Sequence, residues 1–117
     1  MTEGWRRRAF VSLWATAVAA AGIAGVAVLR AREAKPATHS VTIDATRFQP
    51  ARLVVHPGDT IVWVNKDVIP HTATAKGGFD SKVLAPGASW RLTVRVKGAT
   101  DYACLFHPAM TGRVDAE

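Results

Sequence analysis

Cysteine is the residue that this sequence most conspicuously lacks, because Cys104 is the only one among 117 residues. A single cysteine excludes an intramolecular disulfide, a zinc site with two or more cysteines, and an iron–sulfur cluster held by four. Methionine is nearly as scarce, with Met110 the only one besides Met1. A lone thiol calls for an explanation, and metal ligation is one.

A basic surface is also missing from most of the chain, although the formal net charge is +6. The first 37 residues hold six of the 15 Lys/Arg and two of the nine Asp/Glu. The remaining residues therefore have a net charge of only +2. They carry no basic stripe interleaved with aromatic residues, which excludes a nucleic-acid-binding function.

The N-terminal segment has the pattern of an export signal. A basic cluster precedes a run from Ala9 to Leu29 that contains no charged residue, and this run is long enough to form an apolar helix that spans a bilayer. Arg7-Arg8-Ala9-Phe10-Val11 resembles the twin-arginine signal, while an ordinary secretion signal is the alternative. We expect residues 1–37 to be a signal or a membrane anchor (through residues 9–29) plus a linker. Residues 38–117 would then form a periplasmic or otherwise extracytoplasmic domain.

The rest of the chain consists of short β-branched segments separated by Gly/Pro turns, with no amphipathic helix after Arg32. This spacing predicts an all-β fold, namely an antiparallel β-sandwich with Greek-key connections. In the expected strand after Pro86-Gly87, Trp90, Leu92, Val94 and Val96 share one face. The expected strands are 40–45, 52–55, 60–64, 71–75, 89–96, 100–106 and 112–115.

The chemistry is concentrated in one stretch, where Cys104, His107 and Met110 follow one another at intervals of three residues. A thiolate and imidazoles in a trigonal site, with a weak thioether contact, suit a redox-active copper ion. Zinc could occupy the same ligands. Such a site needs a second imidazole from elsewhere in the chain.

Three other histidines could supply that imidazole. His39 lies in the expected linker and His56 in a turn, so we expect both to be solvated surface residues. His71 follows Pro70 at the end of a loop, and loops cluster at the ends of a sandwich. His71 can therefore meet the loop that carries Cys104.

At this point the order of motifs resembles the cupredoxin family over about residues 41–114, within its plastocyanin/amicyanin branch. The matching motifs are Phe48-x-Pro50, Gly58-Asp59-Thr60-x-x-Trp63-x-Asn65-x-Asp67, Pro70-His71-Thr72, Phe79-Asp80-Ser81, Pro86-Gly87 and Tyr102-x-Cys104-x-x-His107-Pro108-x-Met110-x-Gly112. The two-residue gaps on either side of His107 are those of the short amicyanin-type ligand loop.

The resemblance implies one type 1 copper ion, with His71, Cys104 and His107 as strong ligands and Met110 as a weak axial ligand. It also implies that the side chain of Asn65 ties the two ligand loops together beside the cysteine.

The expected function is a monomeric electron carrier that transfers single electrons between transient redox partner proteins and is not an enzyme. A copper-binding module for copper delivery or storage is the alternative. We expect partners to dock on an apolar patch around His107. Its members are small or apolar residues of the two loops: Ile69, Pro70, Phe106, Pro108 and Ala109.

Overall fold

The computed structural model describes residues 35–117. The chain divides into two units, Met1–Glu33 and Ala34–Glu117, and the second unit holds seven strands. The predicted signal or anchor and its apolar helix lie outside the described residues. Among residues 35–117 no helix is long and apolar enough to cross a membrane. The strands are β1 (Thr38–Asp44), β2 (Arg47–Gln49), β3 (Arg52–Val55), β4 (Thr60–Asn65), β5 (Ser89–Thr93), β6 (Gly98–Ala103) and β7 (Thr111–Ala116).

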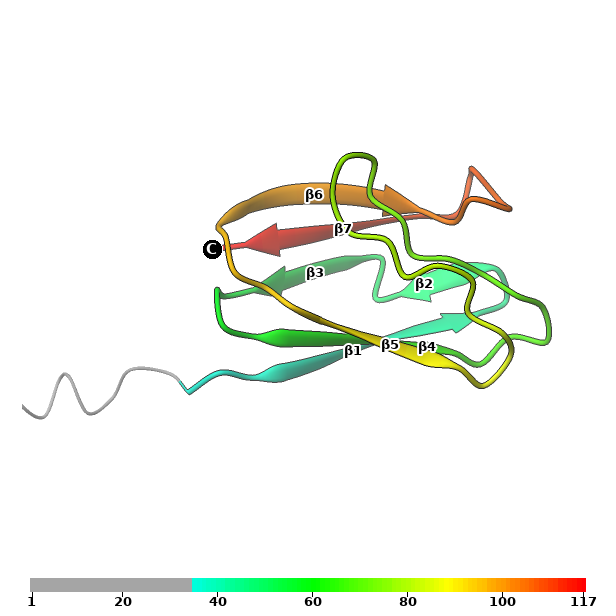
Figure 1. Ribbon diagram of the computed structural model, residues 1–117, viewed down its shortest axis with the longest axis horizontal. Helices are drawn as coiled ribbons and strands as arrows, with labels where there is room; N and C mark the ends of the chain where they lie inside the picture. Colours follow the sequence, from blue (N-terminus) through cyan, green and yellow to red (C-terminus); the bar gives the residue numbers. More distant parts are fainter. Residues whose placement is uncertain (1–34) are drawn as a thin grey trace, which may run out of the picture. The chain divides into compact units, whose positions relative to one another are not determined.

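Two sheets form the predicted sandwich (Figure 1). One sheet has the order β2-β1-β4-β5, and the other has the order β3-β7-β6. The prediction of a purely antiparallel sandwich is wrong, because β1 pairs parallel to β4 and β3 pairs parallel to β7. The chain leaves the first sheet to form β3 and then returns as β4 beside β1. That crossover, unlike a hairpin, brings two strands together in the same direction.

Individual strands were predicted with uneven success. The strand at 52–55 is β3, and the strand at 60–64 is β4 with one more residue. β1 begins at Thr38 rather than at Ser40, so His39 lies on a strand and not in a linker. β2 was not among the predicted strands; it forms a short hairpin with β1 just before Pro50.

The predicted strand at 71–75 is wrong, since this segment makes only isolated bridges to Leu84, Asp80 and Ala103. Two backbone amides of this segment donate hydrogen bonds to side chains and are therefore not available for pairing with a neighbouring strand. The Thr72 amide donates to the Cys104 sulfur, and the Ala73 amide donates to Ser81 Oγ. The strand predicted at 100–106 likewise ends at Ala103. Both ligand-bearing segments are therefore loops.

An aromatic cluster fills the core between the sheets. Trp63 is fully buried, and its ring centroid lies 5.3 to 5.6 Å from those of Phe79, Trp90 and Tyr102. Tyr102 fills the space over Gly112, its partner across the β6–β7 ladder. Val96, predicted to share the buried face of β5, is 78% exposed because the strand ends at Thr93.

The turn between β1 and β2 is strained. Its two residues, Ala45 and Thr46, have φ angles of 49° and 57°, in the left-handed region that Cβ-bearing residues disfavour. This conformation matches the twist of a two-residue hairpin, where Asn-Gly is the preferred pair. The turn also directs the Thr46 amide to the carboxylate of Asp67, 3.0 Å away.

Replacing Thr46 with Gly should therefore stabilise the protein. Relief of the left-handed strain, about 1–2 kcal/mol, exceeds the entropic cost of glycine, about 0.5–1 kcal/mol. We expect the free energy of unfolding in urea to rise by roughly 0.5–1 kcal/mol. The control is Thr93→Gly, the same exchange at an exposed position of β5, which should lower it by about 1 kcal/mol. Equal signs for the two variants would contradict this account.

Candidate metal centre

The loop from Cys104 to Met110 is closed by its own backbone. The Cys104 amide donates to the Met110 carbonyl at 3.0 Å, and the Met110 amide donates to the His107 carbonyl at 2.8 Å. Cys104 follows the last residue of β6, while Thr111 begins β7. Both ends of this short loop are thus fixed by adjacent strands of one sheet, which leaves the loop little freedom.

His71 comes from the other ligand loop, between β4 and β5. Its amide donates to the Leu84 carbonyl at 3.1 Å, and its carbonyl accepts from the Leu84 amide at 2.7 Å. The side chain of His71 is fully buried, whereas His107 is only partly buried. The two imidazoles therefore differ in access to solvent.

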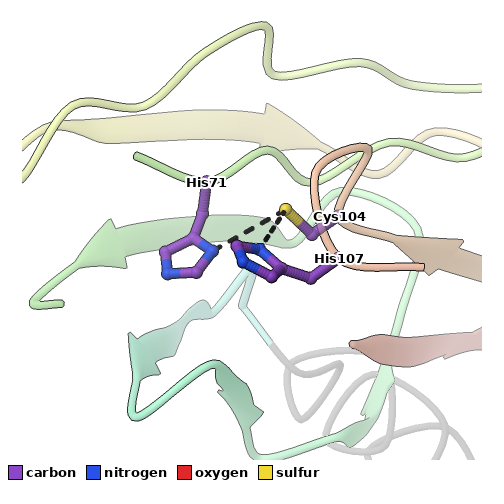
Figure 2. A group of neighbouring side chains, drawn as sticks. All are labelled: His71, Cys104 and His107. Carbon is purple, nitrogen blue, oxygen red and sulfur yellow. Dashed lines mark hydrogen bonds between the residues drawn. The ribbon is translucent and has the colours of Figure 1, made fainter. Parts of the chain in front are cut away.

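Figure 2 shows that His71, Cys104 and His107 converge. The Nδ1 atoms of His71 and His107 lie 3.7 and 3.8 Å from the Cys104 sulfur. The three donor atoms lie within 4.8 Å of one another, and no other such group occurs among residues 35–117.

These distances fit a trigonal metal site. A bound metal such as zinc lies about 2.3 Å from a thiolate sulfur and about 2.0 Å from an imidazole nitrogen. At the 120° angles of a trigonal site these lengths separate sulfur and nitrogen by about 3.7 Å. The donors can therefore hold an ion with little movement.

Met110, the predicted axial ligand, is 4% exposed at the end of the Cys104 loop. Cys104, at the other end of this loop, is 1% exposed. The loop hydrogen bonds hold the Met110 backbone against both Cys104 and His107. A soft, buried donor set of this composition suits copper.

The surroundings of the Cys104 thiol favour its thiolate form. Burial alone would raise its pKa, but hydrogen bonds from the Thr72 amide, from His107 and His71, and from the Phe106 amide lower the pKa to about 6. The Thr72 amide lies 3.4 Å from the sulfur. Since the thiolate is the metal-binding form, the site is prepared for a cation.

Asp67, which the ligand predictions did not include, orients the His71 ring. Its Oδ2 lies 2.8 Å from His71 Nε2 and also accepts the Thr46 amide, while its Oδ1 accepts the Val68 amide. Hydrogen bonds from His71, Thr46 and Val68 hold the pKa of this carboxyl below its usual value. The contact directs His71 Nδ1 toward the sulfur, as outer partners of metal-binding histidines commonly do. The sequence signals were an acidic residue four positions before the histidine and its place in the motif that ends at Asp67.

Asn65 has a different role from the predicted one. Its Nδ2 donates to the carbonyls of Ile69 and Leu84, each at 2.9 Å, and its Oδ1 accepts the Asp67 amide. These bonds shape the loop before His71 but do not reach the Cys104 loop. Thr72 makes that connection instead, since its Oγ1 accepts the Leu105 amide at 3.0 Å.

The predicted docking residues lie on the surface. Ile69 is 38% exposed and Phe106 is 52% exposed, and Pro70, Pro108 and Ala109 are also exposed. Further exposed apolar residues of the same two loops, absent from the prediction, extend the set: Val68, Val83 and Leu105.

The two remaining histidines do not join the donor group. His56 is exposed as expected, but His39 is partly buried, so the prediction of a solvated His39 is wrong. His39 Nε2 lies 2.8 Å from Asp59 Oδ2. Hydrogen bonds from the Ala37 amide, the His39 side chain and the His56 amide hold the pKa of Asp59 far below its usual value. This cluster fastens the start of β1 to the turn before β4.

Comparison with known proteins agrees with this geometry. The family model for the cupredoxin-like domain matches residues 9–114. The chain belongs to the cupredoxin family. Amicyanin from Paracoccus denitrificans is 30% identical over 83 residues, and amicyanin from Paracoccus versutus is 29% identical over the same length. Each alignment covers 66% of this chain and 63% of its relative, so the chain spans less than two thirds of these curated relatives.

Solved structures extend the likeness to the fold. A reduced amicyanin variant superimposes with a TM-score of 0.65 at 30% identity, covering 74% of this chain and 88% of that one. A copper-containing nitrite reductase from Thermus scotoductus gives the same TM-score at 26% identity, covering 73% of this chain but 23% of the enzyme. This cupredoxin is thus amicyanin-like, and its donor geometry is that of a copper site.

Exchanging Asp67 for Asn should weaken the site, because an amide removes the charge that holds His71 Nε2. We expect copper affinity to fall by about 10- to 100-fold, the usual cost of losing such a partner. Competition with a chelator measures the effect. Asp44→Asn is the control, since this exposed carboxylate accepts only the neighbouring Ala45 amide among the described bonds. Equal copper affinities in the two variants would show that Asp67 does not support copper binding through His71.

Proposed function

We propose that this protein is an electron carrier with one type 1 copper ion, held by His71, Cys104 and His107 with Met110 as a weak axial ligand. The observation that carries the proposal is the buried sulfur with two imidazole nitrogens at 3.7 and 3.8 Å. Bound copper would supply a centre that takes one electron from a donor protein and passes it to an acceptor, with no bond made or broken. The protein's contribution is to hold the ligands still.

The two ligand loops are well suited to that task. The Cys104 loop is anchored in the β6–β7 sheet, and His71 is paired with Leu84 through two backbone hydrogen bonds. In addition, Asp67 holds the imidazole of His71 through a hydrogen bond, and the Thr72 amide donates a hydrogen bond to the Cys104 sulfur. A donor set held in this way changes little between oxidation states, as rapid electron transfer requires.

His107 is the proposed route for the electron. Of the three strong ligands only His107 is partly exposed, while His71 and Cys104 are buried. The exposed apolar residues of the ligand loops, including Ile69 and Phe106, form a surface that can bind a partner through apolar contacts. A small apolar interface of this kind allows fast dissociation of transient redox partners.

The proposed place of action is outside the cytoplasm. The support is the sequence pattern of residues 1–37, in which arginines precede an apolar run. A monomer attached to or released from the membrane could then exchange electrons with partner proteins in the periplasm.

Copper delivery or storage is the alternative function. A delivery protein benefits from exposed, exchangeable ligands, whereas here Cys104 and Met110 are nearly inaccessible.

An enzyme would need an open coordination position or a second metal. Among residues 35–117 there is no further group of donors that could bind a second metal.

Repeated reduction and oxidation of the protein, with its copper content measured after each cycle, distinguishes the electron carrier from the delivery protein. The copper-loaded protein should accept one electron per chain from a chemical reductant and return it to an oxidant over repeated cycles. Copper content should stay constant in the presence of a competing chelator. Loss of copper to the chelator upon each reduction would instead support delivery, and the absence of reversible reduction would overturn the carrier proposal.

The apolar surface can be tested without knowing the partner, through electron self-exchange between two copies of the protein. Phe106→Lys should slow self-exchange by at least about tenfold, because it removes apolar contact and places like charges at the interface. NMR line broadening in mixtures of oxidised and reduced protein measures the rate. Val96→Lys is the control, since Val96 is exposed outside the ligand loops. An equal rate for both variants would refute docking at Phe106.

A further inference from the structure

Behind the sulfur, three side-chain oxygens form a chain that connects the ligand loops to a surface carboxylate. Thr72 Oγ1 accepts the Leu105 amide at 3.0 Å. Thr74 Oγ1 lies 2.9 Å from Thr72 Oγ1 and 3.2 Å from Asp80 Oδ1. The chain therefore runs from the backbone next to Cys104, through two hydroxyl groups, to Asp80.

The hydroxyl protons can be placed by counting donors. Thr72 is 1% exposed, and the neighbour available to its hydroxyl proton is Thr74 Oγ1. Thr74 has one proton, and the Asp80 carboxylate can only accept. Both hydroxyls are satisfied when Thr72 donates to Thr74 and Thr74 donates to Asp80.

Asp80 is itself held in place at the end of the chain. Its Oδ1 accepts the Lys82 amide at 2.8 Å, and its Oδ2 lies 3.3 Å from Lys82 Nζ. The hydrogen bond from the Lys82 amide is the main cause that keeps the pKa of Asp80 below its usual value. A backbone bridge between Thr74 and Asp80 fixes the two residues relative to each other.

We propose that Thr72, Thr74 and Asp80 form a positioning network that, together with the two backbone hydrogen bonds between Thr74 and Ala103, holds the two ligand loops in place and supports the hydrogen bond from the Thr72 amide to the Cys104 sulfur. A carboxylate at one end polarises each hydroxyl in turn, so every bond in the chain is strengthened. The Leu105 amide donates to Thr72 Oγ1, while the Thr72 amide donates to the sulfur at 3.4 Å.

This inference rests on the proposed function, because hydrogen bonds around the sulfur tune the redox potential of a copper–thiolate centre. The network itself can be tested without the metal. Its three members are positioning residues, since none of them belongs to the donor group.

Thr74→Val tests the hydroxyl, because valine keeps the shape of threonine and removes the oxygen. In the metal-free protein the amide proton resonance of Leu105 should move upfield as its hydrogen bond weakens. In the copper-loaded protein, copper loss to a chelator should become roughly tenfold faster, the low end of the effects of outer partners. Thr74→Ser, which keeps the hydroxyl, should restore both. Identical behaviour of the Val and Ser variants would overturn the proposal.

Asp80→Asn tests the charge at the end of the chain. Removing a negative charge should raise the reduction potential, because the carboxylate favours the more positively charged oxidised site. Asp101→Asn is the matched control, since this carboxylate is paired with Arg113 on the β6–β7 sheet. Equal shifts in the two variants would show that only overall charge matters and would remove Asp80 from the network.

The outcomes keep the two proposals apart. A wild-type protein that cannot be reduced reversibly would contradict the electron-carrier function, whatever the Leu105 resonance does. An unchanged Leu105 resonance in Thr74→Val would contradict the network, whatever the redox behaviour. If Thr74→Val fails to fold, the Asp80→Asn comparison decides.

Discussion

The contact between the Thr72 amide and the Cys104 sulfur is the point at which two separate parts of the chain become one site. One part is the long connection between β4 and β5, which carries His71, and the other is the short loop between β6 and β7. The 3.4 Å hydrogen bond joins them, and the Leu105 amide joins them again at Thr72 Oγ1. The two sheets serve to bring these loops to the same end of the sandwich. Where the loops meet, His71 completes the group of donors that Cys104 and His107 begin.

The site also shows how the protein meets opposing demands on its polar groups. Burying a thiol disfavours its ionised form, yet amide and imidazole hydrogen bonds lower the pKa of Cys104 to about 6. Burying His71 completely requires a partner for its second nitrogen, and Asp67 supplies one at 2.8 Å. Asp67 in turn is held by the amide of a strained turn, at Thr46. A backbone amide in one hairpin thus helps to fix a ligand that lies 25 positions further along the chain.

The sequence was sufficient for the all-β class and most of the strands, because alternation and turn residues are local features. The convergence of His71 with Cys104 and His107 was expected from the clustering of loops at the end of a sandwich and from the resemblance to the cupredoxin family. It failed where contacts between distant residues decide the outcome. The segment after His71 has the composition of a strand, but side chains from Cys104 and Ser81 occupy its amides. Parallel pairing of β1 with β4 depends on a crossover that no local pattern encodes. Asp67 and Thr72 were missed as partners of the ligands for the same reason, and Asn65 was given a contact that Thr72 makes.

The most direct test of the central claim is the visible absorption spectrum of the oxidised, copper-loaded protein, recorded beside that of Cys104→Ser. If copper is bound by the thiolate together with His71 and His107, the protein should show an intense blue charge-transfer band. That band should disappear on reduction and be absent from the Cys104→Ser variant. A colourless copper-loaded protein, or a band that survives the loss of the thiol, would contradict the account.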